Sequence, residues 1–238
     1  MTAARATAVH MDEREVLAWL AQKGSRRGVE AMARYGIPND GAFGVPMGTL
    51  LAFARRLGKD HALAAALWKT GRYEARLLAA LVDEPSRVTR KQMDAWASAF
   101  DSWAVTDSVC FHLFSRVPAA WEKARQWSAS PREFVKRGGF ALMASLVLRD
   151  KAAPDARFVA LLPLMERGAR DERNFVKKGV NWALRTVGKR SRTVHAAALA
   201  AARRLAESEE PAPRWVGKDA LRELASPKVR ARVARGAN

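Results

Sequence analysis

One stretch of the chain places an acid among aromatic and apolar residues. Trp103, Asp107, Cys110 and Phe114 recur at i, i+4, i+7 and i+11, so a helix that begins near Trp103 presents all four on one face. The carboxylate is out of pattern there, and two interpretations stay open. Asp107 is either an acid held beside an aromatic wall for catalysis, or an aspartate of the first helical turn that complements the helix dipole and caps free N–H groups.

A second candidate surface is basic and contains a tryptophan. On the helix expected over 172–189, an apolar stripe lies opposite a face that carries Lys178, Trp182, Arg185 and Lys189. Cations on one face can hold phosphates, and an indole can stack on a sugar or base or attract a cation. The alternatives are an ordinary solvated face and a tryptophan that packs against a neighbouring repeat.

Arg137 is a third candidate, on the helix expected over 132–149. It lies in line with Ala141 and Ala144, and small residues beside an arginine let a bulky partner approach closely. The alternative is an arginine whose stem lies along apolar surface while its head pairs with a neighbouring helix.

The charge balance indicates a polyanionic partner. The 238 residues include 42 Lys+Arg and 24 Asp+Glu, which gives a formal net charge of +18, and 49% of the residues are hydrophobic. A folded protein with this excess favours nucleic acid first and an anionic membrane surface second. The alternative is a compositional bias that spreads arginine over the whole chain.

Several function classes are excluded by what the sequence lacks. Cys110 is the single cysteine and the four histidines are far apart, so neither a disulfide framework nor a thiolate zinc site is expected. The longest apolar stretch, near 138–148, is too short to cross a membrane, and residues 1–11 have no apolar core typical of a secretory signal. We therefore expect a cytoplasmic protein that requires no metal or organic cofactor.

Helix-favouring residues dominate and glycine or proline separates the segments, which predicts an all-α fold. The predicted helices cover about 12–22, 26–35, 46–57, 60–69, 72–83, 89–100, 103–115, 118–127, 132–149, 155–169, 172–189, 192–206, 213–224 and 227–235. With no long linker between them, we predict a flexible segment over 1–11 and a single domain over 12–238.

A weak internal repeat indicates how these helices stack. The segment 133–138 (EFVKRG) is echoed 41 residues later by 174–179 (NFVKKG), with a fainter copy near 73–76. A period near 40 with two helices per unit is typical of HEAT-like repeats, which stack into a curved α-solenoid. The concave surface of such a solenoid suits a rod-like partner such as duplex DNA.

At these residues the sequence resembles the DNA alkylation repair enzyme family, the AlkD-like HEAT-repeat DNA glycosylases, over roughly 12–225. The segments that carry the resemblance are 41–46 (GAFGVP) followed by Leu50, 67–76 (LWKTGRYEAR), 94–107 (DAWASAFDSWAVTD), 134–142 and 171–189 (DERNFVKKGVNWALRTVGK). Their order matches the family's order.

The resemblance implies a site. The family's catalytic aspartate falls on Asp107, its two groove tryptophans on Trp103 and Trp182, and its key arginine on Arg137. All four positions are kept, whereas some relatives lack parts of the site and only bind. The chain departs at Ala104, where the family commonly has an acid.

The activity implied is hydrolysis of the N-glycosidic bond of positively charged N3- or N7-alkylated purines in duplex DNA, without base flipping. Lys178, Arg185 and Lys189 are expected to join Arg137 in holding phosphates. The expected partner is double-stranded DNA with alkylated bases, bound by a monomer. The alternative is a non-catalytic HEAT-repeat scaffold that binds nucleic-acid backbone or an acidic protein.

Overall fold

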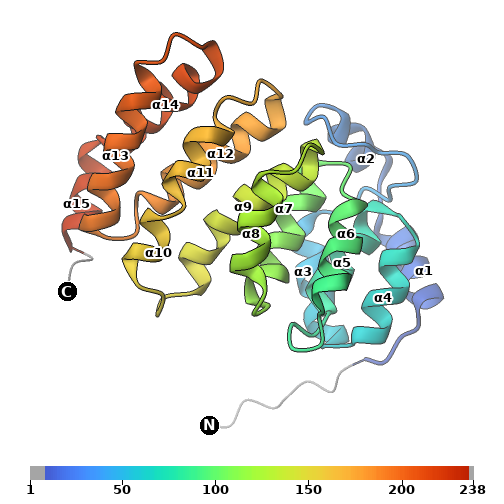
Figure 1. The fold of residues 1–238 in the computed structure, drawn as a ribbon. Coiled ribbons are helices and arrows are strands. Elements are labelled where there is room, and N and C mark those ends of the chain that lie inside the picture. The colour runs from blue at the N-terminus through green and yellow to red at the C-terminus, as the bar shows by residue number, and fades with distance from the viewer. Residues whose placement is uncertain (1–8, 236–238) are drawn as a thin grey trace. The chain divides into compact units, whose positions relative to one another are not determined.

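The computed structural model describes residues 9–235, and within this range every regular element is a helix (Figure 1). The chain divides into two compact units on either side of the Val117–Pro118 bond. The first unit contains α1 (Glu13–Lys23), α2 (Arg26–Ala33), α3 (Met47–Leu57), α4 (His61–Lys69), α5 (Tyr73–Val82), α6 (Arg90–Ser98), α7 (Trp103–His112) and the 3-10 turn η1 (Phe114–Arg116). The second contains α8 (Ala120–Ser128), α9 (Glu133–Arg149), α10 (Asp155–Val159), α11 (Leu162–Gly168), α12 (Asn174–Val187), α13 (Arg192–Ala206), α14 (Pro211–Leu224) and α15 (Pro227–Arg235).

The predicted helices match these elements closely, and the main difference is at 155–169. That single predicted helix is two, α10 and α11, separated at Ala160 and Leu161. Pro163 explains the break, because proline has no N–H to donate and its ring clashes with the carbonyl four residues earlier. It is tolerated at the start of α11, where those N–H groups have no helical partner.

The first unit is built around α5, which packs against α3, α4 and α7. Almost every side chain of α5 is buried. Stacked aromatic rings extend this core: Trp68 lies 4.1 Å from Trp96, and Trp19 lies 3.6 Å from Phe53, between ring centroids. Helix α7 therefore packs against a central helix that is almost entirely buried.

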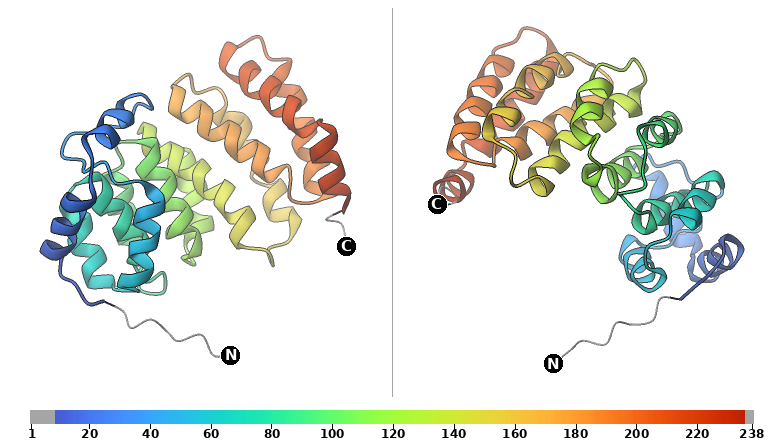
Figure 2. Two further views of the ribbon diagram at one scale, coloured as in Figure 1. Left: turned by 180° about the vertical axis from the view of Figure 1, so that it is seen from behind. Right: turned by 60° about the horizontal axis from the view of Figure 1, so that its bottom comes forward.

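The second unit is a succession of neighbouring helices, α9, α12 and α14, with α8 on α9 and α13 on α14 (Figure 1). In Figure 2 the hairpin of α13 and α14 can be followed in orange and red towards the C-terminus. The backbones of α8 and α9 approach closely at Gly139, where a Cβ atom would lie 2.4 Å from the backbone nitrogen of Ser128. Only glycine allows that approach.

The internal repeat is a structural repeat. Its two copies form the first turns of α9 and α12, and the rings of Phe134 and Phe175 lie 5.4 Å apart. The relation continues to α14, where Asn181 donates to Asp219, 38 residues further along the chain. Contacts at separations near 40 residues are expected when each repeat packs on the next one. The prediction of an all-helical repeat fold is confirmed.

The predicted domain organisation stays a prediction. Of the N-terminal segment 1–11, residues 1–8 lie outside the described chain, and Val9 donates a backbone hydrogen bond to the Arg56 carbonyl. None of the described helices combines the length and apolar character that crossing a membrane would need.

Candidate nucleic-acid interface

Helix α7 begins at a capped N-terminus. Ser102 is the N-cap, and its hydroxyl accepts from the Val105 N–H at 3.4 Å, while the Thr106 hydroxyl donates to the Ser102 carbonyl at 2.7 Å. Asp107 is the fifth residue of α7, and the first turn contains no acid. Ser102 therefore does the capping, and the interpretation of Asp107 as a first-turn cap is wrong.

The face predicted to carry Asp107 runs from the surface into the core. Trp103 and Asp107 are half-buried, whereas Cys110 and Phe114 are fully buried. The indole Nε1 of Trp103 donates to the Tyr35 carbonyl at 2.9 Å, which ties the segment after α2 to the start of α7. The acid and the indole thus lie one turn apart at the accessible end of the face.

Arg137 is buried, with only 6% of its surface exposed. Its guanidinium donates to the Phe175 carbonyl at 2.6 Å, in the first turn of α12. Ala141 and Ala144 are also buried, so they pack in the core rather than leave room for a partner. The hydrogen bond to the Phe175 carbonyl joins Arg137 to the neighbouring helix α12.

The basic face of α12 is already partly neutralised. Lys178 is exposed and Trp182 half-exposed, but the side chains of Arg185 and Lys189 both pair with Glu223 of α14, the guanidinium at 2.5 Å. Burial raises the pKa of the Glu223 carboxyl, but the bonds from Lys189 and Arg185 outweigh it and hold this pKa below its ordinary value.

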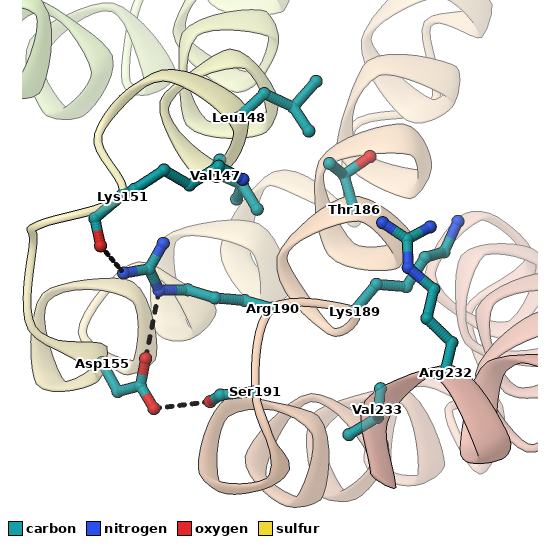
Figure 3. Close-up of a pocket in the computed structure, with 10 residues that line it drawn as sticks. All are labelled: Val147, Leu148, Lys151, Asp155, Thr186, Lys189, Arg190, Ser191, Arg232 and Val233. Carbon is teal, nitrogen blue, oxygen red and sulfur yellow. Dashed lines mark hydrogen bonds and ion pairs between the residues drawn. The ribbon is translucent and has the colours of Figure 1, made fainter. Parts of the chain in front are cut away.

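A pocket of about 490 Å³ lies beyond the end of α12 in the second unit (Figure 3). Figure 3 shows Lys189 and Arg232 on one side of it and Arg190 on the other. Arg190 is held by the Asp155 carboxylate at 3.0 Å and by the Ala153 carbonyl. Lys189 pairs with Glu223 and Lys151 donates to the Val147 carbonyl, so these basic groups of the pocket also have partners.

The seven predicted site residues fall into two groups, one in each unit. Trp103 and Asp107 lie together on α7. Arg137 lies on α9, and the other four lie on α12 or in the two residues after it: Lys178, Trp182, Arg185 and Lys189. Among the residues the structure describes, no group of three His, Cys, Asp or Glu side chains could hold a metal ion.

Comparison with known families adds a decisive observation. The family model described as DNA alkylation repair enzyme matches residues 16–224, which is most of the chain and includes all seven predicted site residues. The chain belongs to the DNA alkylation repair enzyme family.

The chain is also similar to a curated protein and to a solved structure. An uncharacterized protein of Listeria innocua is 25% identical over 179 residues, which cover 74% of this chain and 78% of the relative. The solved structure is described as a new family of proteins related to the HEAT-like repeat DNA glycosylases with affinity for branched DNA structures. The match covers 96% of this chain and 97% of the solved chain. Its TM-score is 0.79 at 21% identity. The HEAT-like repeat fold predicted from the sequence is thereby confirmed.

Two of the segments that carry the family resemblance meet at Glu74. This carboxylate is fully buried at the start of α5 and accepts from the backbone N–H groups of Phe43, Gly44 and Val45 at 2.9, 2.6 and 3.1 Å. The loop can present three N–H groups to one carboxylate because Gly44 takes a φ of 77°. Glu74 thus holds the loop before α3.

Arg76 positions the start of α7. Its guanidinium is buried over the ring of Trp68 and donates to the Asp101 carboxylate at 2.7 Å and to the Ala99 carbonyl at 2.5 Å. These acceptors directly precede the N-cap of α7. Neither Glu74 nor Arg76 was predicted as a functional residue, although charged residues within a mostly apolar helix segment are a signal for buried ion pairs.

A similar network joins α9 to α12. The Asp171 carboxylate accepts from Arg173 at 2.7 Å and from Lys136 at 2.8 Å, and Arg173 also donates to the Pro131 carbonyl. Hydrogen bonds from Arg173 and then from Lys136 hold the pKa of Asp171 well below its usual range, although burial acts in the opposite direction. These bonds connect the two segments that precede the repeat helices.

At Ala104, where the family resemblance implies an acid, the environment explains why a small residue fits. Only 7% of its surface is exposed, on the core-facing side of α7. An acid at this position would have to be desolvated or paired.

Proposed function

We propose that this chain is a DNA glycosylase that removes positively charged N3- and N7-alkylated purines from duplex DNA. Membership in the DNA alkylation repair enzyme family supports it, as does the net charge of +18. The observation that carries the proposal is the half-buried carboxylate of Asp107, which lies one helical turn from the half-buried indole of Trp103 on α7.

The chemistry needs one carboxylate and no cofactor. An alkylated purine is cationic. When the bond between its nitrogen and C1′ breaks, the purine keeps the bonding electrons and leaves as a neutral base. The sugar then resembles an oxocarbenium ion, which the Asp107 carboxylate stabilises. A water oxygen bonds to C1′, and Asp107 accepts the proton that the water loses.

The remaining predicted residues bind the DNA and select the damaged base. The indole faces of Trp103 and Trp182 favour a cationic lesion over a neutral base. Lys178, Arg185 and Lys189 contact phosphates. Arg137 was also predicted to hold phosphates, but it is buried and donates to the Phe175 carbonyl, so we assign it the role of positioning the start of α12. No pocket that encloses a flipped base is part of this proposal, so bulky adducts are accepted.

The test is release of N7-methylguanine and N3-methyladenine from an alkylated duplex. We expect release by the wild type and at least a hundredfold slower release by Asp107→Asn, with unchanged duplex affinity. Equal release by both proteins would refute the role of Asp107.

The second candidate is a non-catalytic DNA-binding protein. The solved relative described as having affinity for branched DNA structures favours it. It predicts that the wild type releases no base, binds DNA in a salt-sensitive manner, and prefers a four-way junction to a linear duplex of the same length.

A further inference from the structure

The first unit contains a smaller pocket whose charged lining is entirely basic. Its volume is about 310 Å³, and it is lined by Leu51, Ala54, Arg55, Gly58, Lys59, Leu81, His112 and Arg116. These residues come from α3 and the turn after it, from α5, from α7 and from η1. No carboxylate is among the described residues that line it.

Lys59 is held in place with one donor to spare. Its Nζ donates to the backbone carbonyls of Leu81 and Asp83, both at 2.8 Å. An ammonium group has three N–H donors, so one remains for a ligand. The Asp83 carboxylate is engaged elsewhere, by His61 at 2.6 Å and by Gln92 at 2.7 Å.

The pocket brings like charges together without neutralising them. Arg55 and Arg116 are exposed, and neither forms an ion pair with any residue in the described range 9–235. Burial, and then the charge of Arg116, lower the pKa of Lys59, and they outweigh the opposite effects of Asp83 and Glu84. Such repulsion is relieved when an anion binds.

The pocket of the second unit differs in this respect. There Asp155 pairs with Arg190, and Glu223 pairs with Lys189. By contrast, the described residues that line the first-unit pocket include no acidic partner for its cations.

We propose that this pocket binds a phosphoryl group, with donors from Arg55, Lys59 and Arg116. The apolar side chains of Leu51 and Leu81 would contact the organic part attached to it. A volume of about 310 Å³ is at the lower end of the range for small-ligand sites, and a mononucleotide unit suits it. The phosphoryl group belongs either to a DNA strand, which rests on the proposed function, or to a free nucleotide.

The test measures binding to the full chain by calorimetry at low salt, with deoxyadenosine 5′-monophosphate (dAMP) and with deoxyadenosine. We expect only dAMP to bind, and the variant Arg55→Gln/Arg116→Gln to bind it at least tenfold more weakly. The matched control is Arg56→Gln/Arg34→Gln, which removes the same charge from exposed arginines outside the pocket. Thermal unfolding of both variants checks that they fold.

A parallel titration with undamaged duplex DNA separates the two sources. Loss of duplex affinity beyond that of the control assigns the site to a strand phosphate, and loss confined to dAMP assigns it to a free nucleotide. If neither ligand is weakened more than in the control, the proposal is wrong. Because binding is the readout, this result is independent of base release, and Asp107→Asn is expected to bind dAMP normally.

Discussion

At the scale of single residues, the interface on α12 depends on one carboxylate. Glu223 occupies the donors of both Arg185 and Lys189. A DNA phosphate is also an anion and could accept hydrogen bonds from the same two cations. Glu223 therefore competes with DNA if these cations bind phosphates.

This competition can be measured with Glu223→Gln. We expect the affinity for undamaged duplex to rise by about threefold to tenfold and to become more salt-dependent. Each additional phosphate contact makes the slope of log K against log salt more negative by about 0.9. Filter binding across a salt series provides the measurement.

The matched control for this prediction is Glu166→Gln, which frees Arg204 instead. Arg204 is not one of the predicted interface residues, so this change should leave the salt slope as it is. A fall in duplex affinity in Glu223→Gln would mean that the pair with Glu223 only supports the packing of α12 on α14.

At the scale of elements, buried charged groups hold loops and helix N-termini against neighbouring helices through hydrogen bonds and ion pairs. Glu74 holds the loop before α3, and Arg76 holds the residues before α7. Lys136 and Arg173 hold Asp171 where α9 and α12 begin. The helices that carry the candidate site are thus positioned at their N-termini.

Replacing Glu74 by Gln tests how much the buried carboxylate stabilises the loop before α3. One amide oxygen cannot replace a carboxylate that accepts three N–H groups, so we expect the free energy of unfolding to fall by about 2–4 kcal/mol in urea titration. Glu15→Gln is the control, because a glutamine also serves in the capping box of α1. Equal effects of the two changes would show that the loop does not depend on the Glu74 charge.

The Asp171 network predicts a pH dependence. Its pKa is depressed in the folded protein, so its contribution to stability is present above the unfolded value of about 3.9 and is lost as the pH falls through the folded value. We expect Asp171→Asn to be less stable than the wild type at pH 7, with a difference that shrinks below about pH 4.

Urea midpoints at a series of pH values from about 7 to about 2 measure this effect. Asp40→Asn, at an exposed aspartate outside the network, serves as the control for removing a carboxylate. A constant difference between Asp171→Asn and the wild type would contradict the predicted role.

At the scale of the whole molecule, the predicted site residues are distributed over both compact units. Trp103 and Asp107 belong to the first, and Trp182 belongs to the second. The proposed function requires both indoles to act on the same damaged nucleotide. Residues that act on one group show coupled effects when they are changed together.

A double-mutant cycle on the excision rate tests this requirement. We expect Trp103→Ala and Trp182→Ala each to slow excision about tenfold, ~1.4 kcal/mol in activation free energy, and the double variant to be slowed by less than the product. Trp215→Ala, at an exposed tryptophan of α14, should combine with Trp103→Ala multiplicatively. Multiplicative effects for Trp103 and Trp182 would indicate separate roles.

Most of the fold was predictable because its signals are local. Apolar periodicity and the breakers between helices predict nearly every helix, and the echo of 133–138 in 174–179 predicts the stacking of α9 and α12. The one divided helix was also signalled locally, by Pro163. The candidate site residues on α7 and α12 were predicted from helical faces and from the family resemblance.

The sequence by itself determined the helices, their repeat, the excess of positive charge and the family. Only the tertiary structure decided that Ser102 rather than Asp107 caps α7, that Arg137 is buried, and that Glu223 neutralises Arg185. The physical reason is that burial and ion pairing depend on which side chains meet across helices about 40 residues apart. Helical periodicity gives the face on which a charge lies but not the partner that the next repeat brings to it.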